Sequence, residues 1–354
     1  MNLTRRPKIV LLGMMSKMPV AGVVWQTMHY IIGFQRLGCE VIYVEAHGCT
    51  PRCFIMNPDD DGFAKAAAYI DDVMRRFDLG DQWCYHPLYG DDRYFGMSEA
   101  QLRAHYASAD LIINLHGGTE PLPEHSQNGR LIYLETDPVE LQIELHEKRP
   151  RTIEFLQPHA AFFSFGENFG HTDCKLPVSG QFDFKPTRQP VVVDFWEGRA
   201  VGGAERFTTI GNWRQVHRQV HFAGETYYWS KHFEFLKFVD LPALTPQRFE
   251  LALSSYEAED VRFLEGKNWA VRDGLALSQD PDDYRRYIAE SRGEYTVAKD
   301  QNVRFRTGWF SDRSATYLAA GRPVITQETG FSNVLPTGRG LFGFATMDEL
   351  LSAI

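Results

Sequence analysis

Short apolar runs alternate with longer segments of helical period through the first half of the chain. Residues 9–12 form a compact apolar run, which suits a strand buried on both faces. Residues 25–37 then carry apolar side chains at helical spacing and stop at Gly38, and residues 40–44 form the next apolar run. This strand–helix–strand opening predicts a parallel sheet. The alternation continues with helices expected at residues 62–77, 98–106 and 139–147 and strands at 110–115, 131–134 and 161–164.

The pattern is interrupted between residues 177 and 203, where Pro and Gly recur, and we interpret this stretch as the passage between two domains. The alternation then resumes, with strands expected at 207–210, 249–254, 295–298 and 323–326 and helices at 229–239, 280–291 and 311–320. The predicted domains are residues 1–187 and 188–354. The predicted fold class is α/β, with two Rossmann-like, doubly wound parallel-sheet domains facing across a cleft.

Composition narrows the class of protein. Of the 354 residues, 44% are hydrophobic and 23% are charged, as is usual for a globular protein, and two domains suit this length. The net charge is −9 without a run of Lys and Arg, so we expect no nucleic-acid partner. The five cysteines lack paired C-x-x-C spacing, which favours free thiols over a metal site, and Cys49 and Cys53 give only a weak metal hint. The first apolar run is too short for a signal peptide or a membrane span, so we expect a cytoplasmic protein without stable membrane insertion.

The candidate chemistry lies in residues 308–341, GWFSDRSATYLAAGRPVITQETGFSNVLPTGRGL. Ser311 or Asp312 can cap the helix that follows, and the first turn of a helix leaves backbone N–H groups that favour an anion. Arg313 adds a positive charge, and Ser314 and Thr316 add hydroxyl donors. A diphosphate would find several donors there without a metal ion.

The strand that follows this helix leads into a second polar segment. Gln327, Glu328, Thr329 and Gly330 come directly after the apolar residues 323–325. Ligands of open parallel sheets bind beyond the carboxyl ends of the strands, so this loop is expected beside the helix start.

These residues carry a resemblance to a known family. The segment TYLAAGRPVI, residues 316–325, is similar to the "EAMAAGxPVV" pattern in the donor-binding domain of two-Rossmann-domain (GT-B) glycosyltransferases, in particular the family-4-like group. Residues 176–186 resemble the "G-x-x-x-x-x-F-x-P" crossover between the domains of that family. Residues 208–214 resemble its "VGR" opening of the second domain.

The sequence departs from the family at two positions. The family often carries two glutamates separated by seven residues, and Gly308 and Thr316 occupy those positions here. The glutamate that the resemblance leads us to expect at the nucleotide ribose is therefore absent, and Asp312 and Glu328 are the nearby acids that could replace it.

Two further basic residues are candidate donor-site residues. Arg214 follows the first strand of the second domain, where the family places a phosphate-contacting arginine, and Lys299 follows the strand at 295–298. Either could neutralise the charge that develops on a leaving diphosphate.

The first half is expected to hold the acceptor. The loop from Gly13 to Gly22 follows the first strand and faces the cleft in the resembling architecture. If the reaction inverts the sugar's configuration, a base must take the acceptor proton, and His116 and Asp137, which each follow a strand, are the candidates. If it retains the configuration, the leaving phosphate can serve as the base, as the resemblance implies.

The resulting prediction is a hexosyltransferase-like glycosyltransferase that moves a sugar from a nucleoside diphosphate sugar to a small-molecule or glycan acceptor. We expect neither a cofactor nor a metal, because side chains and a helix start can hold the diphosphate. Two alternatives stay open: a sugar-nucleotide epimerase on the same fold, and a non-catalytic protein that binds a nucleotide sugar.

Overall fold

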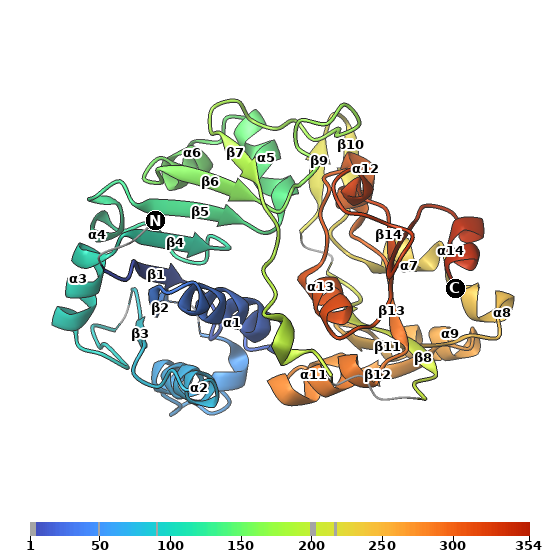
Figure 1. Cartoon of the computed structure of the whole chain (residues 1–354), viewed down its shortest axis with the longest axis horizontal. Coiled ribbons are helices and arrows are strands. Elements are labelled where there is room, and N and C mark those ends of the chain that lie inside the picture. The colour runs from blue at the N-terminus through green and yellow to red at the C-terminus, as the bar shows by residue number, and fades with distance from the viewer. Residues whose placement is uncertain (1–4, 49, 90, 199–202, 216–217) are drawn as a thin grey trace. The chain divides into compact units, whose positions relative to one another are not determined.

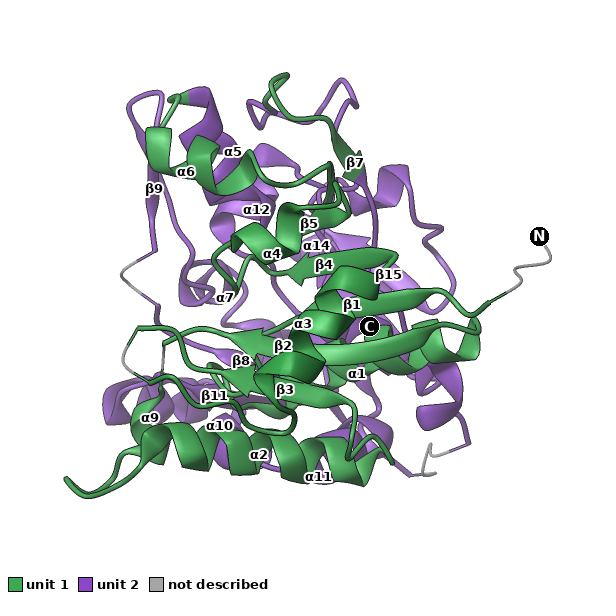
Figure 2. Ribbon diagram, turned by 90° about the vertical axis from the view of Figure 1, so that its left-hand side faces the viewer, with its two compact units in different colours: residues 1–136, 147–164, 179–185 green, residues 137–146, 165–178, 186–354 purple. Residues whose placement is uncertain are grey.

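The chain folds into two compact units, each built around one parallel sheet (Figures 1 and 2). The computed structural model describes residues 5–48, 50–89, 91–198, 203–215 and 218–354. Unit 1 comprises residues 1–136, 147–164 and 179–185, and unit 2 comprises residues 137–146, 165–178 and 186–354. The last segment of unit 2 thus begins at Pro186, close to the predicted boundary at residue 187, while two earlier segments also belong to it.

Unit 1 contains a seven-stranded sheet in the order β3-β2-β1-β4-β5-β6-β7. Its strands are β1 (Lys8–Leu12), β2 (Glu40–Ala46), β3 (Trp83–His86), β4 (Leu111–Leu115), β5 (Leu131–Glu135), β6 (Ala161–Ser164) and β7 (Phe184–Pro186). Its longer helices are α1 (Ala21–Arg36), α2 (Gly62–Arg76), α3 (Glu99–Ser108) and α6 (Pro150–Leu156), with a single turn at α4 (Pro123–Ser126). The pairings from β3 through β6 are parallel.

Unit 2 contains a six-stranded parallel sheet in the order β12-β11-β8-β13-β14-β15. Its strands are β8 (Arg206–Asn212), β11 (Arg248–Ser254), β12 (Ala270–Asp273), β13 (Gly293–Thr296), β14 (Val324–Gln327) and β15 (Leu341–Phe344). Its helices are α5 (Pro138–His146), α7 (His232–Leu236), α8 (Leu241–Leu244), α9 (Ala258–Gly266), α10 (Gly274–Leu277), α11 (Pro281–Glu290), α12 (Asp300–Phe305), α13 (Asp312–Ala319) and α14 (Met347–Ala353).

Both sheets have the Rossmann order, in which the first strand lies beside the fourth and the chain winds outward in both directions. The predicted fold class of two doubly wound parallel-sheet units is therefore confirmed. The apolar runs identified as strands are buried: Leu11 and Leu12 of β1 and Tyr295 of β13 are each at most 1% exposed. Burial on both faces is what makes such strands almost continuously apolar.

The residues between β8 and β11 differ from the prediction. A helix is expected at residues 229–239, but α7 begins only at His232. Before it lies an antiparallel hairpin of β9 (Val220–Phe222) and β10 (Glu225–Tyr227), whose three-residue strands are too short to give a clear alternating pattern. Ser230 holds the loop before α7, since its hydroxyl donates to the carbonyl of Trp213 and accepts from the amide of Gln215.

The four cysteines that the structure describes, Cys39, Cys53, Cys84 and Cys174, are free. Cys49 and residues 199–202 of the predicted interdomain passage lie outside the described residues.

Candidate functional site

The switch point of the unit 2 sheet lies between β8 and β13. From β8 the chain continues to β11 and β12 on one side, and from β13 it continues to β14 and β15 on the other. The two connections diverge at the carboxyl ends of these two strands, and this is where doubly wound sheets bind ligands. The residues that follow β8 and β13 are therefore the first to examine.

Lys231 comes close to this point, because the amide of the next residue, His232, donates to the carbonyl of Trp213 just beyond β8. It directly precedes α7, is partly buried, and forms no ion pair with any carboxylate that the structure describes. Burial, together with the positive charges of Arg313 and Lys299, lowers the pKa of Lys231 to about 7, although Glu294 and Asp312 act in the opposite direction. Such a cation gains the most when an anion binds beside it.

Lys299 lies just beyond β13 and is nearly buried, at 8% exposure. Its ammonium donates to the carboxylate of Asp137 at 2.6 Å and lies 3.1 Å from the ring centroid of Trp229. Burial lowers the pKa of Lys299 in spite of this carboxylate. Two residues singled out from the sequence, Asp137 and Lys299, are thus brought together.

Helix α13 begins beside these lysines without a side-chain cap. Ser311 occupies the N-cap position, but its side chain makes no capping hydrogen bond. Ser314, in the first turn, is fully buried and its hydroxyl has no partner among the described atoms. Asp312 is partly buried, and its pKa is raised by burial. Thr316 instead turns back on the helix and donates to the carbonyl of Arg313 at 2.6 Å.

Arg313 lies inside unit 2, where three acceptors hold its guanidinium. Its Nε donates to Glu294 at 2.5 Å, and its two terminal nitrogens donate to the carbonyl of Ile210 and the hydroxyl of Thr296. Arg313 therefore ties α13 to β8 and β13 and places a fixed positive charge under the switch point.

Arg214, the other arginine predicted from the sequence, also forms an ion pair with a carboxylate. Arg214 makes two hydrogen bonds to the carboxylate of Asp260, at 2.8 and 2.5 Å, and its side chain is 43% exposed. The pKa of Asp260 falls to about 2, mainly because Arg214 donates to it. The pair uses the Nε and one terminal nitrogen of the guanidinium.

Side chains at the end of β14 and in the loop after it tie the neighbouring segments together. Gln327 accepts from the amide of Ala298 and donates to Glu234 of α7 at 2.6 Å, which links the ends of β13 and β14 to the helix after Lys231. Glu328 accepts from the amide of Gly330. Thr329 donates to the carbonyl of Trp309 at 2.7 Å.

The acceptor-side candidates occupy the corresponding switch point of unit 1, between β1 and β4. Gly13 follows β1, and a Cβ there would lie 2.5 Å from the ring of Tyr43, so only glycine fits. Gly22 belongs to the first turn of α1 rather than to the preceding loop. His116 follows β4 with a φ of 64°, and its Nδ1 lies 2.9 Å from the hydroxyl of Thr136.

Two residues of this site are absent from the sequence prediction, Lys231 and Trp309. Lys231 falls within the helix predicted for residues 229–239, and the sequence prediction gives it no role. The ring centroid of Trp309 lies 5.8 Å from the ammonium groups of both Lys231 and Lys299.

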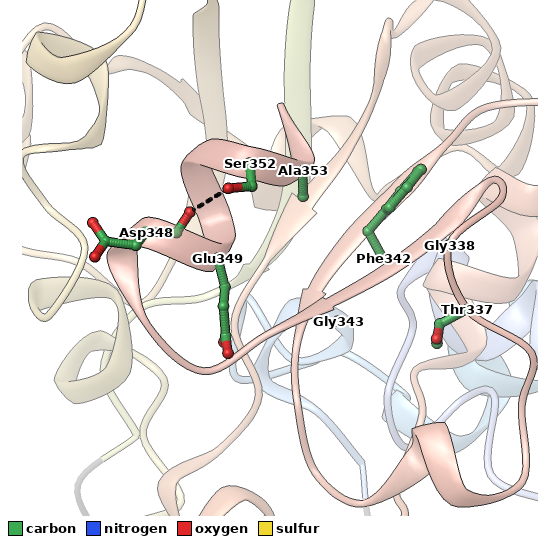
Figure 3. A pocket seen from close by; sticks show the side chains of 8 residues that line it. All are labelled: Thr337, Gly338, Phe342, Gly343, Asp348, Glu349, Ser352 and Ala353. Atoms are coloured by element: carbon green, nitrogen blue, oxygen red, sulfur yellow. Dashed lines mark hydrogen bonds between the residues drawn. The ribbon is translucent and has the colours of Figure 1, made fainter.

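Two hollows of unit 2 are lined by carboxylates. One lies between α14 and the connection from β14 to β15, and its only charged residues are Asp348 and Glu349 (Figure 3). Another lies beside β12, where Arg272 and Arg286 are accompanied by three carboxylates. Within the described ranges no group of three His, Cys, Asp or Glu side chains is arranged to hold a metal ion.

Comparisons with known proteins place structures of glycosyltransferases among the neighbours. A structure described as trehalose-6-phosphate from E. coli bound with UDP-2-fluoro glucose shares 11% identity over 98% of this chain and 90% of that chain, with a TM-score of 0.49. A glycosyltransferase from Rickettsia africae shares 8% identity over 99% and 87%, with a TM-score of 0.49. An alpha-glucosyltransferase in complex with UDP and a 13-mer DNA shares 11% over 96% and 82%, with a TM-score of 0.44. No protein-family model and no curated protein sequence matches the chain.

The exclusion of nucleic acid as a partner needs correction. Several of these neighbouring alpha-glucosyltransferase structures contain DNA together with UDP or UDP-glucose. The prediction is wrong as an exclusion because a net charge of −9 is a sum over the whole chain, whereas a single groove can have a local positive potential. DNA binding is a property of those proteins.

Among the helices that the structure describes, none combines the length and the apolar character that crossing a bilayer requires.

Proposed function

We propose that unit 2 binds a nucleoside diphosphate sugar and that the chain is a glycosyltransferase, which passes the sugar to an acceptor. The observation that carries this proposal is the ammonium of Lys231, which lies at the switch point of the sheet with no carboxylate partner among the described residues. A partly buried cation without a counter-ion is unfavourable unless an anion joins it.

A diphosphate suits the groups gathered there. Lys231 and Lys299 supply two ammonium groups, and the uncapped first turn of α13 supplies backbone N–H groups with the positive end of the helix dipole. Arg313 contributes a fixed charge whose position Glu294 secures. These donors allow the diphosphate to bind without a metal ion or a cofactor, which remains part of the proposal.

The same groups favour the transfer step. As the bond between the anomeric carbon and the phosphate oxygen breaks, negative charge collects on the leaving diphosphate while the acceptor oxygen bonds to the anomeric carbon. Cations already held in place beside the diphosphate stabilise that charge without reorganising. For an inverting reaction His116 and Asp137 stay the candidate bases, and for a retaining reaction the phosphate itself can take the acceptor proton.

A thermal-shift panel of UDP, GDP, ADP and TDP tests the donor site. At about 100 times its Kd a ligand adds about 2.7 kcal/mol to the free energy of unfolding, so the matching nucleotide should raise the Tm by several degrees. Lys231→Ala should weaken that nucleotide roughly 10- to 100-fold, since it removes a charge-assisted hydrogen bond of about 1.5–3 kcal/mol.

Lys267→Ala is the matched control, because Lys267 directly follows α9 and pairs with the exposed Asp240 before α8. Its nucleotide shift should equal that of the unchanged protein. A panel with no shift, or a Lys231→Ala variant with an undiminished shift, would refute the proposed site. Conversion of a nucleotide sugar to an isomer in the absence of an acceptor would indicate the epimerase instead.

A further inference from the structure

A hollow of about 390 Å³ lies at the amino ends of the strands of unit 2. It is lined by the first residues of three neighbouring strands, Arg206 of β8, Arg248 of β11 and Ala270 of β12. The other lining residues come from α8, the start of β11 and the turns before β11 and β12: Pro242, Thr245, Pro246, Gln247, Phe249 and Asn268. No carboxylate is among the described residues that line this hollow, in contrast to the hollows beside α14 and β12.

The two arginines of this hollow are cross-strand neighbours. Arg206 and Arg248 occupy paired positions in the register of β8 and β11. Side chains at paired positions point to the same face of the sheet, so the two guanidinium groups are held close together. Like charges in such an arrangement are unfavourable, and a counter-charge between them is therefore stabilising.

The carboxylates nearby offset these charges only in part. Arg206 donates to Glu250 at 2.7 Å, but Glu250 also lies 4.0 Å from Arg272. Arg248 donates to Glu205 at 2.7 Å, and both of these side chains are more than half exposed. Three arginines thus share two carboxylates among the described residues. An exposed ion pair contributes little to stability, so an incoming anion can displace Glu205 from Arg248.

Both arginines keep hydrogen-bond donors for a further anion. Each ion pair uses one terminal nitrogen of the guanidinium, Nη1. The remaining N–H groups of Arg206 and Arg248 have no acceptor among the described residues. A planar guanidinium matches the spacing of phosphate oxygens, and two of them can hold one phosphate group from two sides.

The rim of the hollow is fixed by the side chain of Gln247. Its Nε2 donates to the carbonyls of Glu205 at 2.6 Å and of Arg248 at 3.2 Å. Its backbone amide donates to the hydroxyl of Thr245 at 3.3 Å, and Pro246 restricts the backbone between them. A rim that is ordered before the ligand arrives lowers the entropic cost of binding.

We infer that this hollow is an anion site in which Arg206 and Arg248 together hold a phosphate group, either as the free ion or as part of a phosphorylated small molecule. The site is separate from the proposed donor site, since the donor groups lie at the carboxyl ends of the strands and this hollow lies at their amino ends. A phosphate bound there offsets the repulsion between the two arginines and so stabilises unit 2.

Calorimetry with inorganic phosphate and with glycerol 3-phosphate, at constant ionic strength, tests the site. Arg248→Gln should weaken binding at least about tenfold, because it removes a charge-assisted contact. Glu205→Gln should strengthen binding by up to about fivefold, because it removes the carboxylate that competes with the phosphate. Arg262→Gln and Glu259→Gln, which each break an exposed pair on α9, are the matched controls and should leave the affinity unchanged.

The two probes distinguish the sources of the phosphate group. Tighter binding of glycerol 3-phosphate than of inorganic phosphate assigns the hollow to a phosphorylated small molecule, and equal or weaker binding assigns it to the free ion. Absence of binding by both probes, or equal losses in Arg248→Gln and Arg262→Gln, would overturn the inference.

Lys231→Ala separates this inference from the proposed function, because it alters the donor site and leaves the amino ends of the strands unchanged. Phosphate binding at the hollow should persist in this variant. Binding that is lost in Lys231→Ala and kept in Arg248→Gln would belong to the donor site and would overturn the inference without affecting the proposed function.

Discussion

At the scale of single residues, the surroundings of Lys231 disfavour its protonated form. Burial and the neighbouring cations Arg313 and Lys299 lower its pKa to about 7, from an ordinary value near 10.5. In the unfolded chain the lysine stays protonated up to about pH 10, so between pH 7 and 10 the unfolded state binds more protons. The contribution of this residue to the free energy of unfolding therefore rises with pH across that window.

Nucleotide binding should show the opposite dependence on pH. A bound diphosphate raises the pKa of Lys231, so the affinity is complete below about pH 7 and falls as the pH rises above it, by at most about tenfold per unit. Calorimetry in buffers of different ionisation enthalpy should detect proton uptake on binding near pH 8.

Lys231→Arg is the matched variant for this experiment, because arginine stays protonated throughout. Its nucleotide affinity should be nearly independent of pH between 7 and 9. The titration of Lys231 would be excluded as the cause if the arginine variant and the unchanged protein lost affinity in parallel.

Some residues of the candidate site could be located from the sequence and others could not. Lys299 could be located from the pattern because it follows an apolar strand. The helix start at residues 311–314 could be located because it precedes an amphipathic run. Lys231 could not, since the apolar spacing of residues 229–239 is helical although Ser230 fixes the first part of that segment as a loop. The direction of Arg313 could not be predicted either, because its partner Glu294 lies on a different element.

At the scale of elements, a buried ion pair helps to hold α13 to the sheet. Glu294 on β13 is fully buried, and Arg313 at the start of α13 lies 2.5 Å from it. Arg313→Ala would leave this carboxylate buried and unpaired, which costs about 3–5 kcal/mol in the free energy of unfolding. Urea denaturation measures the loss.

Arg313→Met combined with Glu294→Gln is the control for that experiment, because it removes both charges and keeps side chains of similar length. This pair should recover part of the stability lost in Arg313→Ala. A loss below about 1 kcal/mol in Arg313→Ala would contradict the structural role of the pair and would return Arg313 to the group of direct phosphate ligands.

Element order was the most predictable feature of the fold. Strands that are buried on both faces can be recognised as apolar runs in the sequence. Their alternation with helices implies parallel sheets. The exceptions are elements whose place depends on distant contacts. Helix α5 follows a strand of unit 1 but groups with unit 2, where Asp137 before it contacts Lys299 and Glu140 lies 3.6 Å from Arg218.

At the scale of the whole molecule, each unit has its own sheet and its own switch point, and the proposed donor groups belong entirely to unit 2. Net charge informed this scale poorly, because a total of −9 coexists with three cations gathered around one strand end. The binding of a small anion depends on the local arrangement of charged groups. The net charge of the chain governs longer-range electrostatic effects.

The most direct test is a crystal structure of the chain with the nucleoside diphosphate that gives the largest thermal shift. The account predicts the diphosphate within hydrogen-bond distance of the Lys231 ammonium and of the first-turn amides of α13, with Lys299 on its other side. A diphosphate bound instead at Arg272 and Arg286 beside β12, or in the hollow beside α14, would contradict it.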